Sequence, residues 1–263
     1  MNSEPERPWL DAAEDALDEG AFDRALELLA AAPPDDGLRW LLSFGVWVEV
    51  DRLDRAAEDL ARAEHLLGDG DPEVLRAKAR LAIARWHFEE ATHWLAYLDP
   101  EEWGAQLLLD RAFLCDAQGD HDEAHRLLVE AHRQDPEHSP APLRLSPEAF
   151  QAVVERAAEE LPPEFADVFE EIAVVIDPMP TRAVVGGEHP PDVLGLFVGP
   201  PLAERAASLG GELPPTIFLF QRNLERIALD EEELAREIHT TLFHELGHAL
   251  GFDEDGVDEL GLA

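Results

Sequence analysis

A recurring alanine restricts the first half of this chain to a stack of paired helices. The alanine returns at intervals of 31, 35 and 33 residues, at Ala25, Ala56, Ala91 and Ala124. Three residues before each of them lies a larger side chain, at Phe22, Leu53, Phe88 and His121. A small residue at one fixed place in each repeat lets two helices touch, and neighbouring units then bury their apolar faces against each other. The spacing therefore predicts about four repeated helix pairs.

The turn inside each pair supports this interpretation. Gly20 and Gly119 mark the turn in the first and fourth units, whereas Asp51 and Trp86 occupy the same place in the middle two. Together with the small residues, this pattern resembles that of tetratricopeptide repeat proteins. The resemblance implies an all-α solenoid over residues 1–134, with a concave surface for a partner peptide or protein. A helical bundle without repeats is the alternative.

A change in composition follows the repeats. Residues 135–145 are rich in proline and predict a linker. The 263 residues of the chain are enough for two domains that each bury their own core. We therefore expect two domains, the helical one over residues 1–134 and a second over residues 146–263.

The second domain carries two histidines four residues apart, with a glutamate directly after the first. His244 and His248 lie one turn apart on the same face of a helix, so both imidazoles can bind one Zn²⁺ at about 2.0–2.1 Å. Glu245 lies roughly 100° further round and is expected to act as the general base on a zinc-activated water. Chance places this His-Glu-x-x-His pattern in roughly one such chain in twenty. A zinc site is therefore the favoured interpretation.

A catalytic zinc site normally has a third protein ligand. Glu254 is the predicted third ligand, because it lies six residues after His248, where metzincin peptidases carry a histidine. Asp253 is the alternative third ligand, and Asp255 and Glu259 are weaker candidates. The alternative for this acidic run is a solvated turn without a metal.

The helix that carries the motif has clear start and stop signals. Asp230 is a predicted N-cap and Glu233 occupies the capping-box position. Gly251 suits the left-handed residue that ends a helix. The apolar positions form one arc, predicted to face the core, and comprise Leu234, Ile238, Leu242, Leu246, Ala249 and Leu250.

Residues from about 145 to 263 resemble small bacterial zincin-like metallopeptidases, also called minimal zincins. The resemblance is carried by residues 172–177, 194–199, 213–220 and 241–261. It implies an α+β domain with a small sheet beside the zinc helix, zinc on two histidines and a carboxylate, and peptidase activity. The metzincin family is excluded, because its methionine turn would lie downstream of the helix and the two methionines, Met1 and Met179, lie upstream.

Three apolar runs predict strands, at residues 172–176, 193–198 and 216–220. We assign the pairing of an extended substrate to residues 216–220, with a purely structural role as the alternative. Four residues are candidates for stabilising the reacting oxygen, although such groups are more often on the surface: Arg182, His189, Arg222 and Arg226. Glu237 or Thr241, on the histidine face of the helix, is instead a candidate for a contact with the metal ligands.

The net charge of −38 disfavours nucleic acid and anionic membranes as partners and favours basic peptides. A single cysteine, Cys115, excludes an internal disulfide. The sequence begins without a basic and apolar leader, and no stretch approaches the roughly 18 apolar residues of a membrane span. We expect a cytoplasmic protein.

These observations predict a zinc-dependent metallopeptidase that hydrolyses peptide bonds, with a helical-repeat domain that binds a partner or substrate. The substrate would be a peptide or a protein. The alternative is a non-catalytic adaptor whose helical repeats bind a client and whose zinc site is structural or vestigial. Glu245 favours the enzyme, because a structural zinc site needs no carboxylate beside its ligands.

Overall fold

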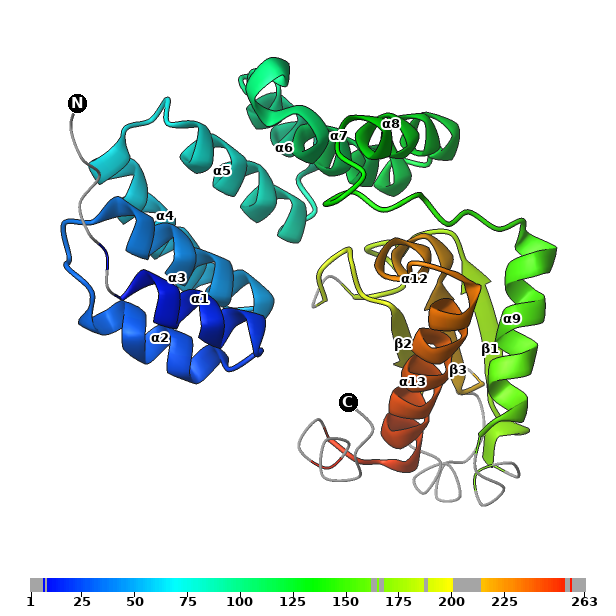
Figure 1. The fold of residues 1–263 in the computed structure, drawn as a ribbon. Coiled ribbons are helices and arrows are strands. Elements are labelled where there is room, and N and C mark those ends of the chain that lie inside the picture. The colour runs from blue at the N-terminus through cyan, green and yellow to red at the C-terminus, as the bar shows by residue number, and fades with distance from the viewer. Residues whose placement is uncertain are drawn as a thin grey trace. The chain divides into compact units, whose positions relative to one another are not determined.

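The computed structural model describes residues 7, 9–161, 165, 168–186, 189–200, 214–253 and 256. The chain divides into two compact units, Met1–Leu107 and Leu108–Ala263. Figure 1 shows helices throughout the first unit and a small sheet flanked by helices in the second. The predicted fold class, a helical part followed by a small α+β domain, is confirmed. None of the described helices is long and apolar enough to cross a bilayer.

The helices of the first part follow one another with short connections. In chain order they are α1 (Leu10–Asp18), α2 (Phe22–Ala31), α3 (Gly37–Glu49), α4 (Leu53–Leu67), α5 (Pro72–Ala84), α6 (Phe88–Leu95), α7 (Pro100–Ala117) and α8 (His121–Gln134). The larger residue that precedes each recurring alanine is the first residue of α2, α4, α6 or α8. The four alanines themselves are completely buried.

The turns between paired helices share one geometry. Gly20, Asp51, Trp86 and Gly119 have φ values of 69°, 51°, 63° and 86°. The next residue in each turn donates its N–H to the carbonyl five residues earlier, at 2.7–2.8 Å, as in a Schellman motif. Asp51 and Trp86 therefore adopt the left-handed conformation that glycine adopts in the other two turns. The described helices thus form repeated pairs, and the tetratricopeptide assignment stays a prediction.

The boundary between compact units lies earlier than the predicted linker. The division falls after Leu107, so the second half of α7 and all of α8 belong to the second unit. Asp116, near the end of α7, forms ion pairs with Arg144 and Arg226 at 2.5 and 3.4 Å. Arg144, at the end of residues 135–145, is thus held by a residue of α7, and the predicted domain bounds stay a prediction.

The second unit combines a three-stranded sheet with three further helices in its described part. These elements are α9 (Pro147–Glu159), β1 (Ala173–Asp177), β2 (Gly195–Val198), β3 (Thr216–Phe220), α12 (Gln221–Ile227) and α13 (Glu231–Leu250). The strand order is β1-β3-β2, with β1 parallel and β2 antiparallel to β3. The predicted strands are confirmed, with small differences at their ends.

The sheet order corrects one prediction. β3 lies between β1 and β2 and is paired along both edges, so residues 216–220 have no free edge for a substrate strand. The role of substrate pairing assigned to them is wrong, and the structural alternative holds. Ile217, Leu219 and Phe220 are completely buried, and the first two pack with α9 and α13 in one apolar core. β3 is thus the centre of the sheet, and β2 is an edge strand next to α13.

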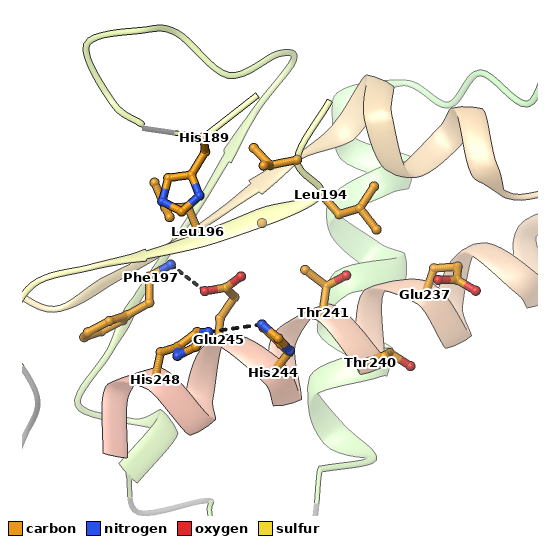
Figure 2. Close-up of a pocket in the computed structure, with 12 residues that line it drawn as sticks. His189, Leu194, Leu196, Phe197, Glu237, Thr240, Thr241, His244, Glu245 and His248 are labelled. Atoms are coloured by element: carbon orange, nitrogen blue, oxygen red, sulfur yellow. Dashed lines mark hydrogen bonds between the residues drawn. The ribbon is translucent and has the colours of Figure 1, made fainter. Parts of the chain in front are cut away.

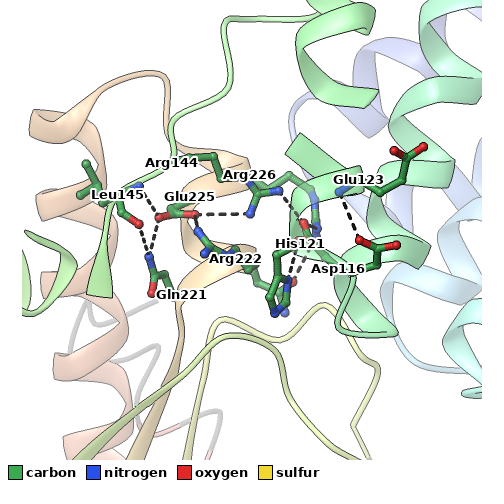
Figure 3. Close-up of polar contacts among 11 residues, drawn as sticks. Asp116, His121, Glu123, Arg144, Leu145, Gln221, Arg222, Glu225 and Arg226 are labelled. Atoms are coloured by element: carbon green, nitrogen blue, oxygen red, sulfur yellow. Dashed lines mark hydrogen bonds and ion pairs between the residues drawn. The ribbon is translucent and has the colours of Figure 1, made fainter. Parts of the chain in front are cut away.

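A buried network of charges joins α7, α8, the segment before α9 and α12 (Figure 3). The Glu225 carboxylate, 1% exposed, pairs with Arg222 at 2.6 Å and Arg144 at 3.4 Å. It also accepts hydrogen bonds from Gln221 Nε2 and from the backbone N–H of Leu145. The fully buried Asp116 carboxylate completes the network. Burial lowers the pKa of Arg226 to about 10, so its guanidinium remains charged at neutral pH.

Candidate metal and catalytic site

The helix α13 positions the candidate site, and its ends follow the sequence signals. Asp230 Oδ1 accepts hydrogen bonds from the N–H groups of Glu232 and Glu233, both at 2.9 Å. The Glu233 carboxylate accepts a hydrogen bond from Leu229 N–H at 2.7 Å. A capping box would instead place this bond on the N–H of the N-cap residue, Asp230, which is the next residue in the chain. The apolar arc is buried as predicted, apart from the partly buried Leu250. Because the apolar arc faces the core, the face of α13 with the two histidines is directed away from the core.

The two imidazoles converge on one point. Their Nε2 atoms lie 3.1 Å apart, and their ring centroids lie 4.8 Å apart with an interplanar angle of 81°. Two nitrogens bound to one tetrahedral Zn²⁺ at 2.0–2.1 Å stand roughly 3.3 Å apart. His244 and His248 therefore offer a pair of nitrogens at a spacing that suits one metal ion (Figure 2).

The turn after α13 fixes the tautomer of His248. Gly251 adopts a left-handed conformation with φ 97°, and the chain turns back so that the Phe252 carbonyl lies 3.1 Å from His248 Nδ1. A carbonyl oxygen can only accept, so Nδ1 carries the proton in this contact. With the proton on Nδ1, metal binding would fall to Nε2, the atom that faces His244.

The side chain of Glu245 extends from α13 to the edge strand β2. Its side chain is buried, with the residue 7% exposed, and its Oε2 accepts a hydrogen bond from the backbone N–H of Phe197 at 2.6 Å. The approach of β2 depends on Gly195, because a Cβ there would lie 2.5 Å from Thr241 Cγ2 and 3.3 Å from Glu245 Cγ. Sequence reasoning missed this contact, since a backbone donor leaves no mark in the sequence.

The site opens into a cavity of about 510 Å³ between α13 and β2. Glu237, Thr240 and Thr241 continue the lining from α13 towards its N-terminus, and His189 contributes from the loop before β2. The opposite wall is mostly apolar and comprises Val193, Leu194, Gly195, Leu196 and Phe197. Histidine nitrogens, the carboxylates of Glu237 and Glu245 and an apolar wall thus share one cavity.

The third ligand stays a prediction. Glu254, together with Asp255 and Glu259, lies outside the described residues. Asp253 is exposed, and its Oδ1 accepts a hydrogen bond from Gly256 N–H at 3.0 Å. In the described part of the chain, no group of three His, Cys, Asp or Glu side chains is placed to hold a metal.

The candidates for stabilising the reacting oxygen lie in different places. Arg222 and Arg226 belong to the buried network, where they pair with Glu225 and Asp116. Arg182 is exposed in the loop before β2. His189 lines the cavity opposite α13 (Figure 2). Among these four candidates, only His189 lies in the cavity, and its role stays a prediction.

The donor set fits zinc, because two imidazole nitrogens and a nearby carboxylate are ligands and partners that this ion commonly takes. The spacing of His244, Glu245 and His248 on one helix resembles that of zinc peptidases with a His-Glu-x-x-His motif. Residues 169–262 match the family model described as zincin-like metallopeptidase, which covers β1 to β3, α12 and α13. The resemblance of this region is therefore confirmed. No curated protein matches the chain.

Proposed function

We propose that the second unit is a zinc-dependent peptidase in which His244, His248 and a carboxylate hold the metal. The spacing of the two Nε2 atoms, 3.1 Å, carries the proposal, because it brings two zinc ligands together beside a buried glutamate. The match of residues 169–262 to the zincin-like metallopeptidase model supports it. Glu254 is the proposed third ligand, with Asp253 as the alternative.

Zinc, when bound, acts as a Lewis acid that activates water and the peptide carbonyl. Glu245 accepts the N–H of Phe197 at Oε2, and its carboxylate would take a proton from the attacking water. As the new C–O bond forms and the C–N bond breaks, the same carboxylate delivers that proton to the leaving amine. The hydrogen bond to β2 keeps the carboxylate from rotating during both transfers.

The replacement Glu245→Gln tests the proposed base. It keeps the size of the side chain and removes its capacity to accept a proton, so we expect zinc to remain bound and hydrolysis to disappear. Metal analysis of the purified protein and digestion of a peptide library measure the two properties. The control is Glu232→Gln, on the exposed part of the same helix. We expect this variant to keep the zinc content and the activity of the wild type. A Glu245→Gln protein that cleaves peptides like the wild type would refute the role of Glu245.

Removal of zinc separates the enzyme from the adaptor alternative. α13 is anchored by completely buried residues that include Leu234, Ile238 and Leu242, so we expect the apo protein to stay folded. Saturating zinc should raise the melting temperature, with about 4 kcal/mol of stabilisation at a thousandfold excess over Kd. Unfolding of the second unit by a chelator, followed by circular dichroism, would favour a structural site instead.

The first unit is proposed to bind the partner or the protein substrate. A cavity of about 390 Å³ there is lined by both Trp40 and Trp47, and the Trp40 ring has the guanidinium carbons of Arg39 and Arg62 at 4.2 and 4.7 Å. The replacement Trp40→Ala should raise KM for protein substrates and leave KM for short peptides unchanged. If Trp40→Ala changed KM by the same factor for protein substrates and for short peptides, this role would be contradicted.

A further inference from the structure

The inference rests on the proposed function and concerns the far end of the same cavity. We propose that Glu237 recognises a positive charge on the substrate, about three residues from the bond that is cleaved. The charge would be the side chain of an arginine or lysine, or a free α-amino group. The preferred substrates would then be peptides with a cationic group at that distance.

The position of Glu237 on α13 sets this distance. It lies seven residues before His244, so two full turns bring both side chains to the same face, roughly 10 Å apart along the helix axis. An extended peptide advances about 3.3 Å per residue. A substrate lying along α13 with its reacting carbonyl at the histidines therefore brings its third residue from that bond to Glu237. Figure 2 shows Glu237, Thr241 and His244 in succession along the helix.

Glu237 differs from the other acidic residues in the first half of α13. Glu231 pairs with Arg156 at 2.6 Å, Glu232 pairs with Arg236 at 3.1 Å, and Glu233 accepts from Leu229 N–H. Glu237 is partly buried in the cavity lining, yet it makes no hydrogen bond or ion pair with any described residue. The protein thus supplies no described cation or donor to this carboxylate, and charged partners are the ones that bind a carboxylate most strongly. A cationic ligand would supply the missing partner.

The rest of the described lining suits such a ligand. It contains no lysine or arginine that would compete for Glu237. Val193 and Leu194 present aliphatic surface to the same cavity, and the alkyl stem of an arginine or lysine can lie against such surface while its charged end reaches the carboxylate. Residues 146–263 carry 25 acidic and 6 basic side chains, and the resulting negative potential attracts cations to this unit.

The test uses the full-length protein loaded with zinc and peptides that differ only three residues from the cleaved bond, on either side. We expect kcat/KM to be roughly tenfold higher with arginine or lysine there than with glutamine, mainly through KM. The replacement Glu237→Gln should abolish this preference. The control Glu232→Gln removes a carboxylate from the same helix outside the cavity and should retain it. A wild type that cleaves basic and neutral peptides equally well, or a Glu237→Gln protein that keeps the preference, would overturn the inference.

A binding measurement separates this inference from the proposed catalysis. The same peptides, labelled with a fluorophore, are titrated into the zinc-loaded Glu245→Gln form and into the double variant that also carries Glu237→Gln. Tighter binding of the basic peptides to the first form alone supports the role of Glu237, even if no form cleaves any peptide. Equal binding of basic and neutral peptides rejects it, whereas failure of the wild type to cleave any peptide rejects only the proposed peptidase.

Discussion

The second unit contains two polar regions that use buried carboxylates in opposite ways. In the network of Figure 3, Glu225 and Asp116 are surrounded by three arginines and by backbone and amide donors. In the cavity of Figure 2, Glu245 has the backbone N–H of Phe197, and Glu237 makes no polar contact with a described residue. The network joins segments that are distant in the sequence, whereas the cavity contains a carboxylate, that of Glu237, without a polar partner among the described residues.

The difference shows how to separate structure from chemistry among charged residues. A buried charge whose partners are all supplied by the protein contributes to one fold, and removing a single partner leaves the others uncompensated. A charge beside a cavity that the protein leaves short of partners is a candidate for binding. This distinction moves Arg222 and Arg226 out of the site, although both lie near it in the sequence.

The largest effect is expected for Glu225→Ala, which removes the centre of the network. Arg222, Arg144 and the N–H of Leu145 would lose their partner, and we expect the unfolding free energy of the second unit to fall by about 3–5 kcal/mol. All six tryptophans lie in the first unit, at positions 9, 40, 47, 86, 94 and 103. In urea unfolding, Glu225→Ala should therefore lower the midpoint of the transition of the second unit, which circular dichroism detects. The midpoint detected by tryptophan fluorescence should stay unchanged.

The control for this loss is Glu231→Ala. Its carboxylate also pairs with an arginine, Arg156, but both side chains are about half exposed, so its removal should cost less than about 1 kcal/mol. Similar costs for Glu225→Ala and Glu231→Ala would remove the contrast between the buried network and surface pairs.

A smaller effect is expected for Gly195→Ala, which presses on the cavity instead. The added methyl group meets Thr241 Cγ2 at 2.5 Å, so β2 must move away from α13 at a cost of about 1–3 kcal/mol. The hydrogen bond from Phe197 to Glu245 should lengthen, and kcat should fall more than KM changes. Gly45→Ala is the control, because its nearest atom is 3.9 Å away. An unchanged kcat for Gly195→Ala would show that this strand does not orient the base.

The replacement Gly251→Ala tests the turn that fixes His248. An alanine at φ 97° strains the backbone by about 1 kcal/mol. Displacement of the Phe252 carbonyl from Nδ1 should weaken zinc binding roughly tenfold, as measured by competition with a chromophoric chelator. Gly119→Ala introduces similar strain at φ 86° away from the cavity and should leave zinc affinity unchanged. An equal loss in both variants would mean that strain alone weakens the site.

The smallest effect concerns a surface pair that resembles the network without its burial. Hydrogen bonds from Arg133, and then Gln134, lower the pKa of Glu130 to about 2. A lowered carboxyl pKa stabilises the fold above the unfolded value of about 4.5, and this contribution disappears as the pH falls towards 2. In an NMR titration, Arg133→Gln should raise the Glu130 midpoint towards 4.5. A midpoint that stays near 2 would mean that Arg133 is not the cause.

Local signals in the sequence predicted the features that depend on neighbouring residues. Asp230, Gly251 and the apolar arc of α13 define a helix within one short segment, and the recurring alanines mark the start of every second helix in the first part. The interaction of His244 with His248 also follows from helix geometry alone. Such features need no knowledge of how distant segments pair.

Features that depend on distant pairing could not be predicted. The sheet order placed residues 216–220 in the centre, and no local pattern distinguishes a central strand from an edge strand of this length. The contact between Phe197 N–H and Glu245 spans 48 positions in the chain. Arg226 meets Asp116 across 110 positions, which is why sequence reasoning placed it near the chemistry.

The uninterrupted helix α13, from Glu231 to Leu250, carries the proposed charge-reading residue and both histidines on a single rigid rod. The pitch of this helix, rather than the fluctuation of a loop, therefore sets the distance between Glu237 and the two histidines. Inserting a single residue between these positions would turn one of them by roughly 100°. The proposed charge-binding carboxylate and the histidines would then no longer lie on the same face of the helix.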